Sequence, residues 1–260
     1  MNKFKPLVEL KNVNLIYHST KTETTALQNI NLDIQKQEFV SIVGPSGCGK
    51  TTILSIISGL LKITDGSVLV AGNKPSTKSN ICGYMFQRDN LLPWRTIENN
   101  LFLGLEIKHQ KSKVRKNYAI SLANKYGIGE FLKKHPSELS GGMRQRVALI
   151  RTLALKPELL LLDEPFSALD YQTRLELCDS IFSIIKQEKK TAILVTHDIQ
   201  EAISMSDRII VLSARPGKIK AVHKLNFSPD LTPFERRKTE ESKILFDTIW
   251  QEIQNETHNI

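Results

Sequence analysis

The chain has 260 residues, of which 40% are hydrophobic and 24% are charged, and its formal net charge is +9. This composition is typical of a globular protein with a sizeable core, and the length suits one large α/β domain or two small ones. No apolar run reaches the ~18–20 residues that cross a bilayer, and the first residues do not resemble a signal peptide. We therefore expect neither a membrane span nor a secretory leader.

The N-terminal part of the chain predicts β-strands joined by short connections. Apolar alternation and short apolar runs place strands at residues 7–17, 26–34, 39–43, 67–71 and 81–86. Residues 18–25 are polar and predict a turn, and Asp65-Gly66 is a turn signal before the fourth strand. A loop at residues 72–80 precedes the fifth strand, which ends directly before Gln87.

One segment among these strands predicts a nucleotide site. Gly44-Pro-Ser-Gly-Cys-Gly-Lys-Thr51 matches the phosphate-loop pattern G-x-x-x-x-G-K-[ST], and a run with helical spacing follows it to Gly59. The glycines allow a tight loop whose N–H groups point at phosphate oxygens, and the helix N-terminus adds its positive dipole. We expect Lys50 to reach the β- and γ-phosphates and the Thr51 hydroxyl to bind Mg²⁺. The candidate nucleotide-binding residues here are Gly44, Pro45, Ser46, Gly47, Cys48, Gly49, Lys50, Thr51 and Thr52.

The periodicity becomes helical after the fifth strand. Residues 97–134 carry apolar residues at helical spacing and many lysines, which predicts a mostly helical insertion. Strands and helices then follow in mixed order. We expect helices at residues 140–155, 169–189, 199–205 and 233–256, strands at residues 159–162, 191–196, 208–212 and 218–224, and a turn at residues 215–217.

Two adjacent carboxylates follow the apolar run Leu159–Leu162, which is typical of a buried parallel strand. A phosphate loop needs a carboxylate at the end of a neighbouring strand to organise Mg²⁺, and we assign this role to Asp163, near Thr51. Glu164 points differently along the same strand end. A carboxylate beside the γ-phosphate can act as general base for an attacking water.

Further motifs resemble those of the ATP-binding subunits of ABC transporters. Leu139-Ser-Gly-Gly-Met143, followed by Arg144-Gln-Arg146, resembles the family signature, with methionine where glutamine is commonest. Ser167-Ala-Leu-Asp170 resembles the D-loop. Because the family tolerates variation at position 143, we expect an active protein.

Three single residues extend the resemblance. Gln87 stands where the Q-loop glutamine would be, and His197 stands at the position of the switch histidine. Tyr17 lies where an aromatic ring would stack on adenine. All of these motifs appear in family order over residues 7–213.

The resemblance implies an α/β fold of the phosphate-loop NTPase class, with a mostly parallel core sheet, an N-terminal antiparallel β-subdomain and a helical subdomain. We expect residues 1–260 to form a single ABC ATPase domain. Residues 1–87 and 157–225 would form the RecA-like core with the antiparallel sheet. Residues 88–156 would form the helical subdomain, and residues 226–260 a C-terminal helical extension.

The resemblance also implies roles for individual residues. Catalysis is assigned to Lys50, Gln87, Glu164 and His197. The expected Mg²⁺ ligands are Thr51, Gln87 and Asp163. Besides the phosphate loop and Tyr17, the residues expected to contact ATP are Ser140, Gly141, Gly142 and Asp170. Residues 140–142 form a second helix N-terminus stripped of side chains, which is an anion site; the family closes it on the γ-phosphate of a second chain in a head-to-tail dimer.

The implied partners are a second copy of the chain on ATP binding, the transmembrane permease subunits and, indirectly, an extracytoplasmic solute-binding protein. Leu91, Leu92 and Trp94 surround Pro93 directly after Gln87, in the part of the family fold that receives a coupling helix of the permease. We expect a peripheral position on the cytoplasmic face of the membrane. The basic runs lie apart and lack interleaved aromatics, so we expect no nucleic-acid partner.

The stretches at residues 91–100 and 212–218 resemble a subgroup of import ATPases for nitrate, sulfonates and taurine. Near relatives in that subgroup serve pyrimidine vitamin precursors, and the substrate does not touch this subunit, so both substrate classes stay open. A further alternative is an ABC-type ATPase outside transport. Such proteins usually carry long coiled-coil insertions or two fused cassettes, and this sequence has neither.

Overall fold

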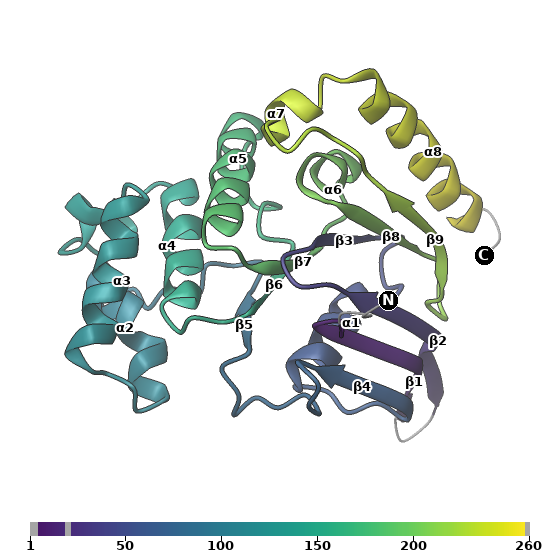
Figure 1. Ribbon diagram of the computed structural model, residues 1–260, viewed down its shortest axis with the longest axis horizontal. Helices are drawn as coiled ribbons and strands as arrows, with labels where there is room; N and C mark the ends of the chain where they lie inside the picture. Colours follow the sequence, from purple (N-terminus) through teal and green to yellow (C-terminus); the bar gives the residue numbers. More distant parts are fainter. Residues whose placement is uncertain (1–4, 19–21, 258–260) are drawn as a thin grey trace.

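The computed structural model describes residues 5–18 and 22–257 of the chain (Figure 1). Helix α1 (Lys50–Ser58) lies between two β-sheets, and one apolar cluster joins its buried residues to both sheets. A second cluster joins the larger sheet to helices on its opposite face. The structure confirms the expected α/β architecture with a mostly parallel sheet, an antiparallel N-terminal sheet and a group of helices.

The smaller sheet is antiparallel and has the strand order β2–β1–β4. Its strands are β1 (Val8–His18), β2 (Glu23–Ile34) and β4 (Asp65–Val70). The turn predicted at residues 18–25 is wrong at its ends, because His18 and Glu23 still pair across the ladder, with 3.0 Å between His18 Nδ1 and Glu23 Oε1. Residues 19–21 lie outside the described residues.

The Asp65-Gly66 pair opens strand β4 instead of preceding it as a turn. Gly66 has a φ of 99°, and it lies against an irregularity in β1, where a Cβ on Gly66 would be 2.5 Å from the carbonyl oxygen of Asn12. A glycine within a strand commonly marks such a bulge. The Asp65-Gly66 pair therefore correctly indicated an unusual backbone conformation at Gly66, but these two residues belong to strand β4 and not to a turn before it.

The larger sheet has the order β5–β6–β7–β3–β8–β9, and only its last pair is antiparallel. The strands are β3 (Phe39–Val43), β5 (Cys82–Met85), β6 (Leu159–Asp163), β7 (Thr191–Val195), β8 (Arg208–Leu212) and β9 (Ile219–Lys224). The inner strands are almost entirely buried, as expected for a parallel sheet covered on both faces. Because β3, β6, β7 and β8 run in the same direction, the segments that follow them meet at one edge of the sheet.

Three helices form a layer at one end of this sheet (Figure 1). They are α2 (Ile97–Ile107), α3 (Lys113–Lys125) and α4 (Gly141–Leu153), with short 3₁₀ turns at Gly129–Phe131 and Pro136–Glu138. The hydroxyl groups of Thr96, Ser112 and Ser140 cap the three helix N-termini, which explains where each helix begins. The predicted helical insertion is confirmed.

Helices α5 (Tyr171–Gln187), α6 (Ile199–Met205), α7 (Pro233–Arg236) and α8 (Glu240–Thr257) complete the fold. The single helix predicted at residues 233–256 is wrong, because it is broken into α7 and α8. Thr232 and Glu235 form a capping box that starts the first piece, and the Thr239 hydroxyl accepts a hydrogen bond from the Ser242 N–H and starts the second. Within the described residues, no helix has the length and apolar content that crossing a membrane requires.

Candidate active site

The loop between β3 and α1 is kept tight by its glycines. Gly47 and Gly49 have φ values of 72° and 101°, which side chains rarely adopt. A Cβ on Gly49 would lie 2.6 Å from Leu27 Cδ2, so strand β2 packs directly against the loop backbone. Gly49 is also the N-cap of α1, and the helix therefore directs its N–H groups and its positive dipole toward the loop.

The Lys50 side chain folds back over this loop. Its Nζ donates hydrogen bonds to the carbonyl oxygens of Gly44 and Pro45, each at 2.8 Å, and the residue is only 8% exposed. A positive charge is thus fixed within the loop. Cys48 is fully buried, and this burial raises the pKa of its thiol despite the opposing charge of Lys50. The Cys48 side chain packs in the core, and only its backbone belongs to the candidate site.

A cavity of about 620 Å³ opens beside the loop, within the range of small-molecule sites. Its lining residues are Tyr17, Ala26, Ser46, Gly47, Gly49, Lys50, Thr51, Thr52, Glu164, His197 and Arg215. Tyr17 is 44% exposed, and its hydroxyl lies 3.4 Å from Thr52 Oγ1, so its ring forms part of the cavity wall. The sequence motifs did not indicate Ala26 or Arg215 as site residues.

The Thr51 hydroxyl and the Asp163 carboxylate lie together at one end of the phosphate loop. Thr51 Oγ1 donates to Asp163 Oδ1 at 2.9 Å, and the Tyr84 hydroxyl donates to Asp163 Oδ2 at 3.0 Å. The pKa of Asp163 is raised above its ordinary value, because the effect of burial exceeds the opposing effect of these two hydrogen bonds. Adjacent hydroxyl and carboxylate oxygens suit Mg²⁺, which takes few protein ligands and completes its shell with phosphates and water. The two oxygen donors therefore fit this ion. Tyr84, which the sequence motifs did not indicate, orients the Asp163 carboxylate.

Glu164 and His197 face each other across the ends of neighbouring strands. His197 Nδ1 lies 3.3 Å from Glu164 Oε2. The Glu164 backbone has a φ of 46°, in the left-handed region, and its N–H donates to the Val195 carbonyl at 2.9 Å. Such a conformation costs energy in a non-glycine residue and is enriched at functional sites. With this backbone conformation, Glu164 lies on the cavity wall while the adjacent Asp163 lies beside Thr51.

Gln87 is connected to the site indirectly. Its Nε2 donates to the Ser167 hydroxyl at 2.9 Å, and that hydroxyl donates to the carbonyl of Glu164 at 3.1 Å. The Gln145 side chain on α4 donates to the Gln87 carbonyl at 3.0 Å. Gln87 therefore links the segment Glu164–Ser167 to α4, the helix that begins with the signature residues. It does not line the cavity in this structure.

The signature residues lie away from the cavity, beside the start of α5. Ser140 caps α4 by accepting a hydrogen bond from the Met143 N–H at 3.3 Å. A Cβ on Gly141 would lie 2.9 Å from the Leu169 side chain, and one on Gly142 would lie 2.9 Å from the Thr173 side chain. Asp170 caps α5 through the Thr173 N–H at 3.0 Å. One chain thus brings Ser140, Gly141, Gly142 and Asp170 together at the starts of α4 and α5, away from the phosphate loop, with Ser140 and Asp170 exposed and Gly142 buried.

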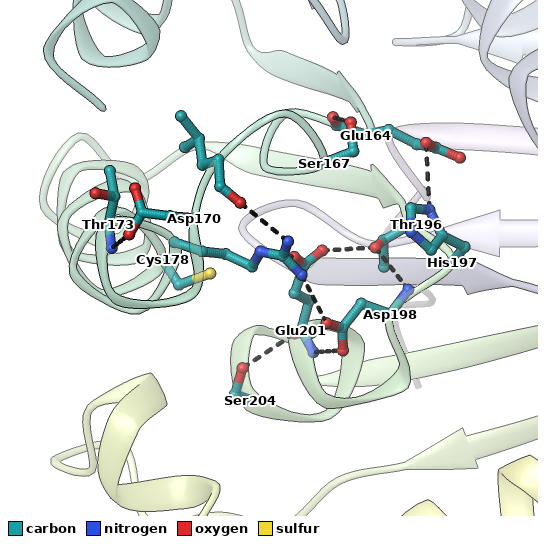
Figure 2. Close-up of polar contacts among 12 residues, drawn as sticks. Glu164, Ser167, Asp170, Thr173, Cys178, Thr196, His197, Asp198, Glu201 and Ser204 are labelled. Atoms are coloured by element: carbon teal, nitrogen blue, oxygen red, sulfur yellow. Dashed lines mark hydrogen bonds and ion pairs between the residues drawn. The ribbon is translucent and has the colours of Figure 1, made fainter. Parts of the chain in front are cut away.

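A buried polar network lies behind His197 (Figure 2). Glu201 on α6 is 3% exposed and accepts a hydrogen bond from Thr196 Oγ1 at 2.6 Å. Burial raises the pKa of this carboxyl to about 7. Asp198 accepts from the Glu201 N–H at 3.1 Å and so caps α6. The sequence contains this signal as an Asp-x-x-Glu capping pattern directly after His197.

Arg174 on α5 ties this network to the D-loop segment. Its Nε lies 3.8 Å from Glu201 Oε1, and its Nη1 lies 3.3 Å from Asp198 Oδ2. Its Nη2 donates to the Leu169 carbonyl at 3.1 Å. One guanidinium group therefore links the residue before Asp170 to the residue after His197.

Comparison with known proteins identifies the family. The sequence model described as ABC transporter matches residues 27–167, which include the phosphate loop, the signature helix and the end of β6. The chain belongs to the ABC transporter family. The expected resemblance is thereby confirmed.

The curated relatives extend over almost the whole chain. The chain is 48% identical over 250 residues to the uncharacterized ABC transporter ATP-binding protein YtlC of Bacillus subtilis, covering 95% of both proteins. It is 44% identical to the aliphatic sulfonates import ATP-binding protein SsuB of Bacillus cereus, covering 87% of both. It is 43% identical to the bicarbonate transport ATP-binding protein CmpC of Synechocystis, covering 81% of this chain and 32% of that protein.

Two solved structures share the fold. One is a dimeric post-hydrolysis state of the ATP-binding cassette MJ0796 bound to ADP and Pi, with 35% sequence identity, a TM-score of 0.70 and coverage of 85% of this chain and 100% of that one. The other is a dimeric structure of the same bacterial cassette, with 34% identity, a TM-score of 0.71 and the same coverage. This protein is therefore an ATP-binding ABC ATPase of the kind that powers transport.

Proposed function

We propose that this protein is the ATP-hydrolysing subunit of an ABC importer for a small solute of the nitrate, sulfonate or taurine type. The observation that carries the catalytic part is the meeting of two pairs, Thr51 with Asp163 and Glu164 with His197, at one edge of the large sheet. The relative named as an aliphatic sulfonates import ATP-binding protein supports the solute class, and the relative named as a bicarbonate transport ATP-binding protein supports a small anion more broadly. A pyrimidine vitamin precursor is the alternative solute.

The residues of the cavity suggest the order of events. The loop N–H groups and Lys50 bind the β- and γ-phosphates, and the adenine packs on Tyr17. Glu164 takes a proton from a water whose oxygen bonds to the γ-phosphorus, while the bond to the β,γ-bridging oxygen breaks and ADP leaves with the electron pair. His197 orients Glu164 across the 3.3 Å contact. Thr51 and Asp163 would hold a Mg²⁺ that neutralises charge on the phosphates. Gln87 would become a third ligand only by leaving its hydrogen bond to Ser167.

The separate position of Ser140, Gly141, Gly142 and Asp170 at the starts of α4 and α5 supports a head-to-tail dimer. A helix N-terminus without side chains suits an anion, and these residues do not line the cavity of their own chain. We propose that they close on the γ-phosphate bound by a second copy. Both solved structures of the cassette MJ0796 are dimeric, which supports this arrangement.

The remaining proposals concern organisation and partners. Residues 1–260 would form one ATPase domain, with residues 1–87 and 157–225 as core and antiparallel sheet, 88–156 as helical subdomain and 226–260 as C-terminal extension. Permease subunits would bind the helical subdomain at the cytoplasmic face of the membrane. A solute-binding protein would act in the same system, and nucleic acid would not be a partner.

A pull-down from native membranes tests the importer role. Tagged protein is expected to recover a multi-span permease, and recovery of only soluble proteins or nucleic acid would contradict transport while leaving the ATPase intact. The solute-binding protein encoded with that permease is then tested against sulfonates, nitrate, bicarbonate and pyrimidines. Tight binding of a pyrimidine alone would replace the proposed solute class by its alternative.

A further inference from the structure

The turn between β8 and β9 touches the nucleotide cavity but has no role in the mechanism above. It contains Arg215, which lines the cavity together with Tyr17 and Gly47. A Cβ on Gly47 would lie 3.9 Å from Arg215 Nη2, so the guanidinium group lies next to the phosphate loop. Arg215 is exposed, and within residues 5–18 and 22–257 no carboxylate forms an ion pair with it.

The backbone of this turn is fixed against the cavity wall. The Gly217 N–H donates to the Ala26 carbonyl at 2.9 Å, and the Gln28 N–H donates to the Gly217 carbonyl at 3.0 Å. A Cβ on Gly217 would clash with the carbonyl oxygen of Cys48, so the turn packs directly on the phosphate loop. These contacts leave little freedom in the backbone from which Arg215 extends.

Helix α8 also contacts this turn. Glu256 Oε2 accepts a hydrogen bond from the Ala214 N–H at 3.1 Å, and its Oε1 accepts from Lys220 Nζ at 2.8 Å. The bond from Lys220 keeps the pKa of Glu256 below its ordinary value, so this side chain is an anion at neutral pH. Ile249 is fully buried and anchors α8 in a cluster that includes Val211 of β8.

We infer that Arg215 binds the phosphate chain of the nucleotide, and that α8 positions Arg215 through Glu256. The inference rests on the proposed position of the nucleotide in this cavity. A guanidinium group presents several donors in a planar fork that matches phosphate oxygens. Lys50 and Arg215 face the cavity from different elements, whereas Glu164 is the one carboxylate on its described lining. This charge balance suits a polyphosphate, and it gives the C-terminal helix a part in nucleotide binding.

Equilibrium binding of ADP to the full chain, measured by calorimetry, tests the role of Arg215. Arg215→Gln is expected to weaken ADP binding about three- to tenfold, as for one charge-assisted hydrogen bond at a partly solvated site. The affinity of Arg215→Lys should lie between those of the wild type and Arg215→Gln. Lys218→Gln is the matched control. It removes the same charge from the same turn, its side chain does not line the cavity, and it should bind ADP like the wild type.

Lys50→Ala separates the inference from the proposed site. If Lys50→Ala binds ADP like the wild type, the nucleotide does not occupy this cavity, and the proposed site and the inference both fail. If Lys50→Ala loses binding while Arg215→Gln retains full affinity, the site stands and the role of Arg215 is overturned. A loss in Lys218→Gln equal to that in Arg215→Gln would also overturn it, since net charge would then explain the effect.

A double-mutant cycle tests the role of α8. Glu256→Ala should weaken ADP binding in the wild-type background and have no further effect in Arg215→Gln, because the two residues act through one contact. Glu252→Ala is the matched control, since the Glu252 carboxylate binds His223 and not the turn. Glu256→Gln keeps an acceptor for the Ala214 N–H and should retain most of the affinity. Equal losses from Glu256→Ala in both backgrounds would overturn the positioning role.

Discussion

The Thr51 hydroxyl lies 2.9 Å from the Asp163 carboxylate, although 112 positions separate the two residues in the chain. The contact follows from the topology, because β3 and β6 are parallel strands separated only by β7. The segments after these strands therefore reach the same edge of the sheet. A third residue, Tyr84 on the neighbouring strand β5, donates to the second oxygen of Asp163 at 3.0 Å.

Tyr84→Phe is expected to raise the Mg²⁺ concentration that ATPase activity requires, without changing the fold. The variant keeps the ring, which stacks on Phe86 at 4.4 Å between centroids, and removes the hydrogen bond that orients Asp163. Loss of a partner that orients a metal ligand typically costs about tenfold or more in metal affinity. A Mg²⁺ titration at saturating ATP measures the shift. Phe86→Leu is the control for lost stacking, and an unchanged half-saturating Mg²⁺ concentration in Tyr84→Phe would refute the orienting role.

Glu164→Gln is expected to lower the ATPase rate by roughly a hundredfold or more, because it removes the proposed general base. Nucleotide binding should persist, since Lys50 and the phosphate loop are unchanged. With ATP and Mg²⁺ the variant should elute as a dimer in gel filtration. Elution as monomer alone would show that the assigned base or the proposed dimer is wrong, and Lys50→Ala is the control without bound nucleotide.

Glu201→Gln is expected to change how stability depends on pH. Burial raises the Glu201 pKa from an ordinary value of 4.5 in the unfolded chain to about 7 in the native state. Between these values the native state holds a proton that the unfolded chain has released, so the wild type loses stability as the pH rises through this window. Glutamine cannot ionise. The free energy of unfolding of Glu201→Gln relative to wild type should therefore rise with pH, by on the order of 3 kcal/mol in total.

Urea unfolding of both proteins at pH 5, 6, 7 and 8 measures this difference. Groups common to both proteins cancel in the comparison, so the changing part belongs to Glu201. A difference that stays constant over this range would show that the Glu201 carboxyl titrates with an ordinary pKa.

Trp94→Ala is expected to weaken binding to the permease while leaving ATP binding intact. Leu91 is 8% exposed and packs in the core of the helical layer, whereas Trp94 is 72% exposed. Loss of a tryptophan at the centre of an interface commonly costs roughly tenfold or more in affinity. Co-purification with the permease measures the effect. Val114→Ala on α3 is the matched control, since Val114 is also an exposed apolar residue of this layer, at 76%. Equal recovery of Trp94→Ala and wild type would exclude Trp94 from the interface.

The sequence contained enough to predict the phosphate loop, the carboxylates after β6 and the parallel arrangement of the strands. Each of these depends on local patterns, namely glycine spacing, apolar runs and the residues that follow them. The break at Thr239 was missed because both halves of the segment have helical periodicity, and a capping hydroxyl decides where the second helix begins.

The supporting residues of the site depend on contacts between distant elements and could not be predicted in this way. Arg174 links Leu169 to Asp198 and Glu201 only because α5 packs beside α6. Arg215 reaches the cavity because its turn pairs with β2. No local pattern states which side chain of a turn will face a cavity formed by other elements.

The helical layer leaves the large sheet after β5 and returns to it at β6, and these two strands are hydrogen-bonded neighbours with Cys82 opposite Leu159. Strand β5 is an edge strand of four residues, and β6 is its one partner in the described sheet. Within the described sheet, the two ends of this helical segment are therefore joined by one short ladder at the sheet edge. Gln87, directly after β5, therefore lies at the margin of the sheet that is farthest from β9, the strand that leads to the C-terminal helices.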